Sequence, residues 1–587
     1  MREGPLAVLL AVLLCAGAAL ATEVAVPATE VAVPAPEEYR EESSSEPGYQ
    51  EVGGSVETLA DGVLRVSVQE SALRPPRGYT PVAVTLHNKG ATPRVVRLGF
   101  ETSGSGRGEV ASREVEVGPR QRLVTWLHIP ATVRYGRLWL RGADEGPKNV
   151  GVFLGEREGA AMVLGAERDF ESGTGLRRVK EPQLWVRFVV PGAAPRELAA
   201  YVGHRAVVVA GEVTAVPADV WAALEAYAVT GGRLTLLRPP RDVGERLPLL
   251  EGTESGLHPY GLGEVRLCAS ADECGWVLLE DVRKEAVPVE PGAPAHDWER
   301  GRSPLRDGLR MLLPGVRAPV GRFLLLIFLF VLAVGPGGLV LARRKGPVAV
   351  LVAVPVVALV TCLSIIAWAV LVEGFATHAA RYSLTWLDRE RARAVTVGVG
   401  GYYANLAPDG VRLPGLSVLL APAEADASQY APVLDWTRGL EVKEGFLPAR
   451  VYREWGEVAV VPTRARLGVR REGGGLRVRN ALGGPLEEGY VRVGGELWEV
   501  PALADGAEGV ATVASEATAG LARRELLRFP ELVVERFEGM PWERWGEPLP
   551  EGGFVVKLGG VGPGPASALP VELHEGVHLV HGQVDEP

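Results

Sequence analysis

Positive charge and catalytic signatures are both in short supply in this chain. Its formal net charge is −10 at pH 7, whereas binding to bulk nucleic acid needs a basic surface that displaces phosphate counterions. The sequence contains no Walker loop, Gly-x-Gly-x-x-Gly fingerprint or Gly-x-Ser-x-Gly elbow. It therefore argues against a nucleic-acid partner and carries no local signature of nucleotide binding or serine hydrolysis.

Cysteine is scarce too, with four residues in 587. Cys15 lies in a segment that we expect to be removed, and Cys362 lies in an apolar run, where packing is the usual role. Cys268 and Cys274 are close in sequence, and in an oxidising compartment such a pair can join. We expect a disulfide between them, and two unpaired thiols are the alternative.

The N-terminal residues have the layout of a secretory signal peptide. Arg2 precedes an apolar run that ends in Ala19-Leu20-Ala21, so we expect residues 1–21 to be cleaved off. Residues 22–54 contain Thr-Glu-Val-Ala-Val-Pro-Ala twice and continue rich in Glu, Ser and Pro. This composition cannot bury a core and predicts a disordered acidic linker. The length of the remainder predicts several folded units.

Two long uncharged runs predict a transmembrane hairpin. The first predicted helix (322–342) contains the uncharged run from Phe323 to Ala342. The second is the uncharged run from Pro347 to Val372. A helix of about 20 residues reaches about 30 Å, the thickness of a hydrocarbon core. The link between the runs is so short that the two helices must be antiparallel neighbours.

The link also predicts the orientation of the hairpin. Because the N-terminus is expected to be exported, 22–321 and 373–587 should lie outside and the basic link in the cytoplasm. This makes the chain a cytoplasmic (inner) membrane protein with the lipid bilayer as a partner. Gly335 and Pro336 predict a kink, and the lack of ionisable residues in both runs argues against transport by the hairpin alone. The cytoplasmic link consists of Arg343, Arg344 and Lys345.

Residues 55–145 alternate between apolar and polar side chains in short runs, as from Leu64 to Val68. Alternation of this kind predicts strands with one buried face. Asn88-Lys89-Gly90 and Gly118-Pro119 supply turns at a spacing that suits a small sandwich. We expect an immunoglobulin-like β-sandwich.

Residues 146–315 change to continuous apolar runs separated by helical segments. Ala206 to Ala210 and Leu234 to Leu237 are two such runs, and Pro217-Ala218-Asp219 begins a helix between them. Unbroken β-branched runs are typical of parallel strands that are covered on both faces. The pattern predicts an α/β domain.

The run Arg205 to Gly211, with Leu224-Glu225-Ala226-Tyr227 and Gly231-Gly232-Arg233-Leu234 after it, resembles the class I glutamine amidotransferase-like domain of a loosely defined set of bacterial membrane proteins. Those proteins also carry a preceding β-sandwich and a following hairpin with a Gly-Pro. Class I amidotransferases use a cysteine nucleophile on a strand-to-helix elbow. That cysteine is missing from this sequence, so the resemblance implies the fold without the activity.

Residues 375–587 return to short apolar runs, such as Val458 to Val461, punctuated by glycine pairs such as Gly494-Gly495. This pattern of short apolar runs and glycine pairs predicts a C-terminal β-rich domain. A short helix is expected near Glu516 to Leu527.

The segment from His574 to His578 matches the zinc-protease pattern H-E-x-x-H, and His581 follows. That pattern holds zinc only on a helix, where positions i and i+4 share a face. The flanking runs favour strands, and Glu575-Gly576 is interpreted as a two-residue hairpin turn. Even on one straight strand the two histidines would lie about 13 Å apart. We therefore expect no metal site, with His574, His578 and His581 as weak candidates.

The expected fold class is multidomain α/β plus all-β: an immunoglobulin-like β-sandwich, an amidotransferase-like α/β domain, a two-helix transmembrane hairpin and a C-terminal β-rich domain. The expected function is that of a non-enzymatic, membrane-anchored envelope protein whose exported domains bind or scaffold. No catalytic residue or cofactor is predicted, and other membrane or envelope proteins are the expected partners. The alternatives are an accessory subunit of a membrane transporter complex and an envelope hydrolase.

Overall fold

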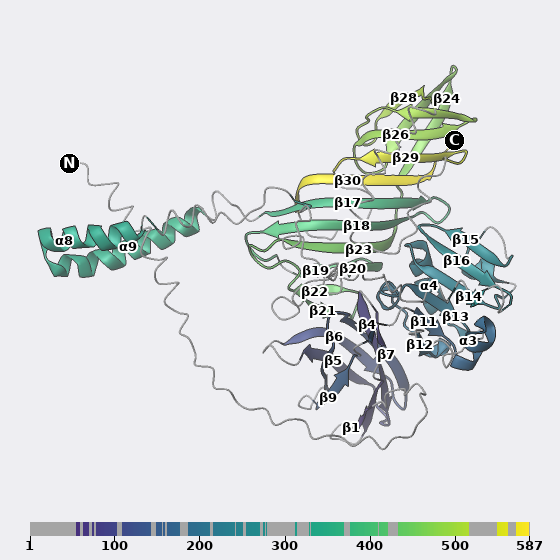
Figure 1. Cartoon of the computed structure of the whole chain (residues 1–587), viewed down its shortest axis with the longest axis horizontal. Coiled ribbons are helices and arrows are strands. Elements are labelled where there is room, and N and C mark those ends of the chain that lie inside the picture. The colour runs from purple at the N-terminus through teal and green to yellow at the C-terminus, as the bar shows by residue number, and fades with distance from the viewer. Residues whose placement is uncertain are drawn as a thin grey trace, which may run out of the picture. The chain divides into compact units, whose positions relative to one another are not determined.

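Strands predominate in the computed structural model of the chain (Figure 1). The expected signal peptide, the acidic linker and the helix near Glu516 lie outside the described residues. The structure describes the greater part of 55–278, most of 328–368, and, with few gaps, 376–420, 432–515, 549–560 and 571–585. The contacts divide the chain into two compact units, one of which includes Gly315–Thr377 and the other Tyr49–Pro314, His378–Tyr402 and Pro408–Pro587.

The first unit holds two neighbouring helices, α8 (Gly338–Lys345) and α9 (Pro347–Trp368), after a π-helical turn, η5 (Ala333–Gly337). The two helices lie side by side in Figure 1, and Val357 of α9 is buried against Val334. Gly346 alone separates the helices, and its φ of 85° is a conformation that favours glycine.

The expected transmembrane hairpin is wrong. Gly335 and Pro336 fall in η5, because Pro336 cannot donate to an α-helical hydrogen-bond ladder. The first run is thus broken before Ala342, and α8 has only 8 residues, or about 12 Å of length. Within the residues that the structure describes, no helix has the length and apolar character needed to cross a membrane. The membrane class inferred from this hairpin is corrected with it.

The basic link is also helical and not a loop. Its three positive side chains occupy the last turn of α8, where they complement the partial negative charge of the helix C-terminus. The outer limits of the expected spans, Phe323 and Val372, lie outside the described residues. The link residues Arg343, Arg344 and Lys345 therefore end α8, and α9 begins at Pro347 as the pattern predicted.

The second unit begins with an antiparallel four-stranded sheet in the order β1-β2-β4-β7. A seven-stranded sheet follows in the order β19-β22-β21-β6-β5-β8-β9, and β10 pairs with β3. The strands are β1 (Ser55–Thr58), β2 (Leu64–Gln69), β3 (Leu73–Arg74), β4 (Tyr79–Asn88), β5 (Arg94–Thr102), β6 (Glu109–Val117), β7 (Arg122–Pro130), β8 (Tyr135–Arg141), β9 (Lys148–Phe153), β10 (Arg157–Glu158), β19 (Val411–Arg412), β21 (Val433–Asp435) and β22 (Glu441–Glu444).

The seven-stranded sheet combines strands from segments far apart in the chain. Its strand β21 pairs in parallel with β6 through Leu434 and Asp435. The indole N–H of Trp436 donates to the backbone oxygen of His128, 2.9 Å away. The indole ring is also in edge contact with the His128 imidazole. The expected immunoglobulin-like sandwich is therefore not a closed unit, because its second sheet is completed by strands from the expected C-terminal domain.

A six-stranded sheet in the order β12-β11-β13-β14-β16-β15 follows in the chain. The apolar runs β13 and β14 pair in parallel, as their unbroken pattern predicts, and β15 alone is antiparallel to its neighbour. The elements are β11 (Ala161–Leu164), α3 (Glu167–Thr174), β12 (Val186–Val189), η1 (Pro191–Ala193), η2 (Leu198–Ala200), β13 (Ala206–Val209), α4 (Ala218–Val229), β14 (Arg233–Leu237), α5 (Val243–Arg246), β15 (Gly256–Tyr260) and β16 (Gly263–Cys268).

The large α/β domain expected over 146–315 is nevertheless wrong. In the described part of that range the α-helices are few and short, the longest being α4 with 12 residues. The range also begins with β9 and β10, which belong to other sheets. Unbroken apolar runs identify buried strands but not the helices between them, so the α/β class overstated the helical part of a mainly β chain.

An eleven-stranded sheet in the order β20-β23-β18-β17-β30-β29-β26-β27-β28-β25-β24 completes the unit. Figure 1 shows the C-terminal strand β30, in yellow, between β17 and β29. The strands are β17 (Thr377–Asp388), β18 (Arg393–Ala404), β20 (Leu416–Leu420), β23 (Arg453–Pro462), β24 (Arg466–Glu472), β25 (Gly475–Ala481), β26 (Leu486–Val493), β27 (Glu496–Val500), β28 (Glu508–Val513), β29 (Gly553–Leu558) and β30 (Val571–Gln583).

A buried charge cluster joins this sheet to the six-stranded one. The Arg393 guanidinium donates to both carboxylate oxygens of Glu225 on α4, at 2.6 and 2.8 Å, and to Asp388 on β17 at 2.8 Å. The three side chains are 14%, 10% and 3% exposed. Such charges are tolerated away from water only because each is paired and hydrogen-bonded.

Replacing Arg393 with alanine should destabilise the protein by about 3 to 5 kcal/mol, because Glu225 would lose its buried counter-charge and Asp388 would lose the nearer of two arginine partners, the other being Arg391 at 3.4 Å. Urea unfolding followed by circular dichroism measures the change. The matched control is Arg412→Ala, which removes an exposed ion pair with Glu441 and should leave the transition midpoint unchanged. Equal midpoints for both variants would contradict the structural role of the cluster.

The Cys268 and Cys274 sulfurs are bonded to each other, with the two Cα atoms 5.9 Å apart. Both residues are buried and belong to the same apolar cluster as Phe170 and Leu237. The bond closes a loop of sequence separation 6 at the end of β16. Neither sulfur is available as a thiolate while the bond is intact.

Replacing both cysteines with serine should lower the free energy of unfolding by about 2 kcal/mol, the loop-closure entropy expected for so short a loop. Differential scanning fluorimetry of the oxidised wild type and the double variant tests this. Adding reductant should lower the wild-type melting temperature and leave that of the variant unaffected. A reductant effect of equal size on both proteins would rule out the disulfide as its cause.

Candidate metal centre

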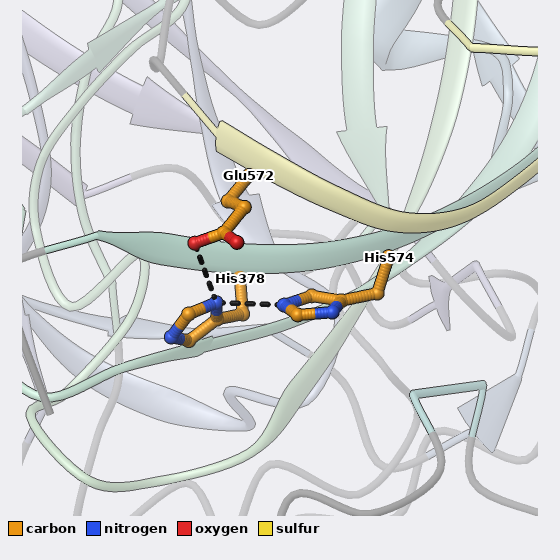
Figure 2. Close-up of side chains that lie close together, drawn as sticks. All are labelled: His378, Glu572 and His574. Atoms are coloured by element: carbon orange, nitrogen blue, oxygen red, sulfur yellow. Dashed lines mark hydrogen bonds and ion pairs between the residues drawn. The ribbon is translucent and has the colours of Figure 1, made fainter.

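Two neighbouring strands of the large sheet bring together a His-Glu-His cluster, defined as His378, Glu572 and His574. His378 is near the start of β17, and the other two residues are near the start of β30. Glu572 and His574 are two positions apart, so the alternation of a strand directs both side chains to one face. Figure 2 shows the carboxylate and the second imidazole approaching the His378 ring from β30.

The His378 Nδ1 atom is the hub of the cluster. It lies 2.8 Å from Nε2 of His574 and 3.4 Å from a carboxylate oxygen of Glu572. The two imidazole centroids are 4.8 Å apart with an interplanar angle of 53°. One ligand atom from each of the three residues can be chosen so that all lie within 4.8 Å of one another.

Both separations from His378 are close to those around one metal ion, and the third, between Glu572 and His574, is at most 4.8 Å and would have to shorten. Zinc binds imidazole nitrogen and carboxylate oxygen at about 2.0–2.2 Å, so two ligand atoms on a tetrahedral ion are about 3.4 Å apart. The carboxylate separation already has this value, and the two nitrogens, at 2.8 Å, need to part by roughly half an ångström. A change of this size lies within the reach of small side-chain rotations.

The cluster is open to solvent. The His378 side chain is 20% exposed and that of Glu572 is 59% exposed, and His574 is also exposed. In the absence of an ion, one imidazole N–H can be shared between the two rings. Ligand nitrogens must be unprotonated to bind a metal, so protons and a metal ion would compete for the same atoms.

The structure corrects the hairpin turn expected at Glu575-Gly576. Strand β30 runs without interruption from Val571 to Gln583. The reason is its neighbours: β17 accompanies the segment before and after Gly576, and β29 pairs with it from His578 onward. A local turn signal is overridden because the segment continues as one strand beside β17.

The remaining histidine candidates do not join the cluster. His578 is 4% exposed, and its Nδ1 atom lies 2.6 Å from the hydroxyl oxygen of Ser383. On a strand it is about 13 Å from His574, too far for a shared ion. His581 lies farther along β30, opposite Val555. Of the three histidines considered from the sequence, the cluster takes His574 alone.

Sequence reasoning missed His378 and Glu572. His378 is 196 positions from His574, and no local pattern points to their contact. Glu572 carried a usable signal, because the alternation Glu-x-His on a β-prone run places a carboxylate and an imidazole on one face. The H-E-x-x-H interpretation drew attention to Glu575 instead.

No protein-family model matches the chain, and a comparison with curated proteins finds no match either. The resemblance to an amidotransferase-like domain therefore stays a prediction.

His578 should make the stability depend on pH. Burial lowers the pKa of this residue to about 4 from the ordinary value of 6.5. Between these values the unfolded chain takes up a proton that the folded protein excludes, so stability present above pH 6.5 is lost as the pH falls toward 4. The expected loss from pH 7 to pH 5 is about 2 kcal/mol.

The measurement is the difference in unfolding free energy between the wild type and His578→Gln at both pH values. Glutamine does not titrate and keeps a partner for Ser383, so the variant should lose less stability on acidification. An identical loss in both proteins would assign the pH dependence to other groups.

Proposed function

We propose that this protein binds a divalent transition-metal ion, zinc above all, through His378, Glu572 and His574, and that it works as a binding or scaffolding protein without catalysis. The observation that carries the proposal is the convergence of two imidazole nitrogens and a carboxylate oxygen, all within 4.8 Å, from two strands. Two nitrogen donors favour zinc and its neighbours over magnesium and calcium, which select oxygen ligands.

The surroundings of the cluster support binding more than turnover. Catalytic metal ions work in dry, shaped cavities that exclude bulk water, whereas the Glu572 side chain is more than half exposed. The scaffold role is supported by the links between segments far apart in sequence, such as Arg393 with Glu225 and Trp436 with His128. Links of this kind hold distant segments together in one compact unit, whose surfaces are then available to partners.

An extracytoplasmic location is part of the proposal. A disulfide between Cys268 and Cys274 is stable in oxidising compartments and rare in the cytosol. Partners in the same compartment, such as other envelope proteins, fit a binding or scaffolding role.

Isothermal titration calorimetry of the full chain with zinc chloride tests the proposed function. The wild type should bind one zinc ion per chain, and His574→Ala should weaken the binding at least tenfold, because one of three protein ligands is lost. The control variant is His258→Ala, which removes a histidine on β15 in the six-stranded sheet. Equal zinc binding by the wild type and His574→Ala would refute the site.

A further inference from the structure

We infer that the metal ion fastens the N-terminal half of β30 to β17, so that metal occupancy controls the local stability of this strand. The inference rests on the proposed metal binding and assigns it a role. It concerns residues Val571–Val577, which we call the leading half of β30, as opposed to the trailing half, His578–Gln583.

Both halves of β30 lie beside β17. His574 of the leading half contacts His378 of β17, and His578 of the trailing half contacts Ser383 of the same strand. Strand β29 also pairs with the trailing half, from Leu558 opposite His578 to Gly553 opposite Gln583. Ligands on β17 and on the leading half can therefore join these two neighbouring strands.

The two halves differ in burial. His578, Leu579 and Val580 are at most 4% exposed. In the leading half, by contrast, Glu572 and His574 are exposed. Segments with few buried apolar contacts open locally at a small fraction of the global unfolding free energy. The leading half is the end of the strand from which opening would begin.

The polar contacts to β17 follow the same division. In the trailing half, His578 bonds Ser383, and just beyond the ends of the two strands Arg389 donates to the Val584 carbonyl and pairs with Asp585. Two side-chain polar contacts between the leading half and β17 pass through His378, one to His574 at 2.8 Å and one to Glu572 at 3.4 Å. This one histidine is the point at which an ion would join the two strands.

An ion held by ligands from both strands binds only when the leading half is closed. Its occupancy lowers the opened fraction by a factor of 1 + [L]/Kd, where [L] is the free ion concentration. An exposed ion pair without the metal contributes little. The expected protection at a free zinc concentration of 100 Kd is therefore about 100-fold.

Hydrogen exchange of the full chain, followed by mass spectrometry with and without zinc at about 100 times the calorimetric Kd, tests the inference. Amides of the leading half should exchange up to about 100-fold more slowly with zinc, and those of the trailing half should be unchanged. The effect should vanish in His378→Ala, which leaves both β30 ligands in place, and persist in the control His258→Ala.

Two results would overturn the inference, and calorimetry on the same samples separates them. Zinc that binds but leaves the leading half unprotected, or slows exchange evenly over the chain, removes the fastening role and leaves the proposed site intact. Absence of zinc binding removes both. Protection that survives in His378→Ala also refutes the role, because β30 alone would then hold the ion.

Discussion

The central position of β30 is the constraint on which the large sheet depends. The order of strands places β20, β23, β18 and β17 on one side of β30. The other side holds β29, β26, β27, β28, β25 and β24. Contacts advance in the same direction along β17 and β30, from His378 with His574 to Arg389 with Val584, so these strands are parallel. The sheet thus becomes continuous only when the last described strand of the chain enters the gap between two others.

The buried charges impose a similar constraint, because they too require distant segments to come together. Glu225 is 168 positions from Arg393, and neither charge can be buried before the other arrives. Asp388, 5 positions from Arg393, is buried with them. The same holds for Glu197, which accepts a 2.6 Å hydrogen bond from Arg113 and lies 3.3 Å from His128. Charges of this kind penalise partly assembled states more than they stabilise the final one, and they favour cooperative folding.

The sequence predicted local elements better than their partners. Unbroken apolar runs correctly indicated β13 and β14, because hydrophobic pattern is a local property. The pairing of β21 with β6 joins Leu434 to Ala111, and nothing in either segment specifies such a distant partner. The transmembrane hairpin failed because Gly335 and Pro336, which were expected only to kink the first helix, lie in a π-helical turn that interrupts it.

The candidate metal centre shows how far a motif depends on its secondary structure. The spacing i, i+4 in His574 and His578 suits a shared ion on a helix, but on a strand it separates the imidazoles by about 13 Å. A strand instead favours the spacing i, i+2 and a third ligand from its neighbour, which is the arrangement of Glu572, His574 and His378. The two histidines then have opposite environments on one strand. Burial keeps His578 neutral against Ser383, whereas exposure leaves His574 accessible to an ion from solution.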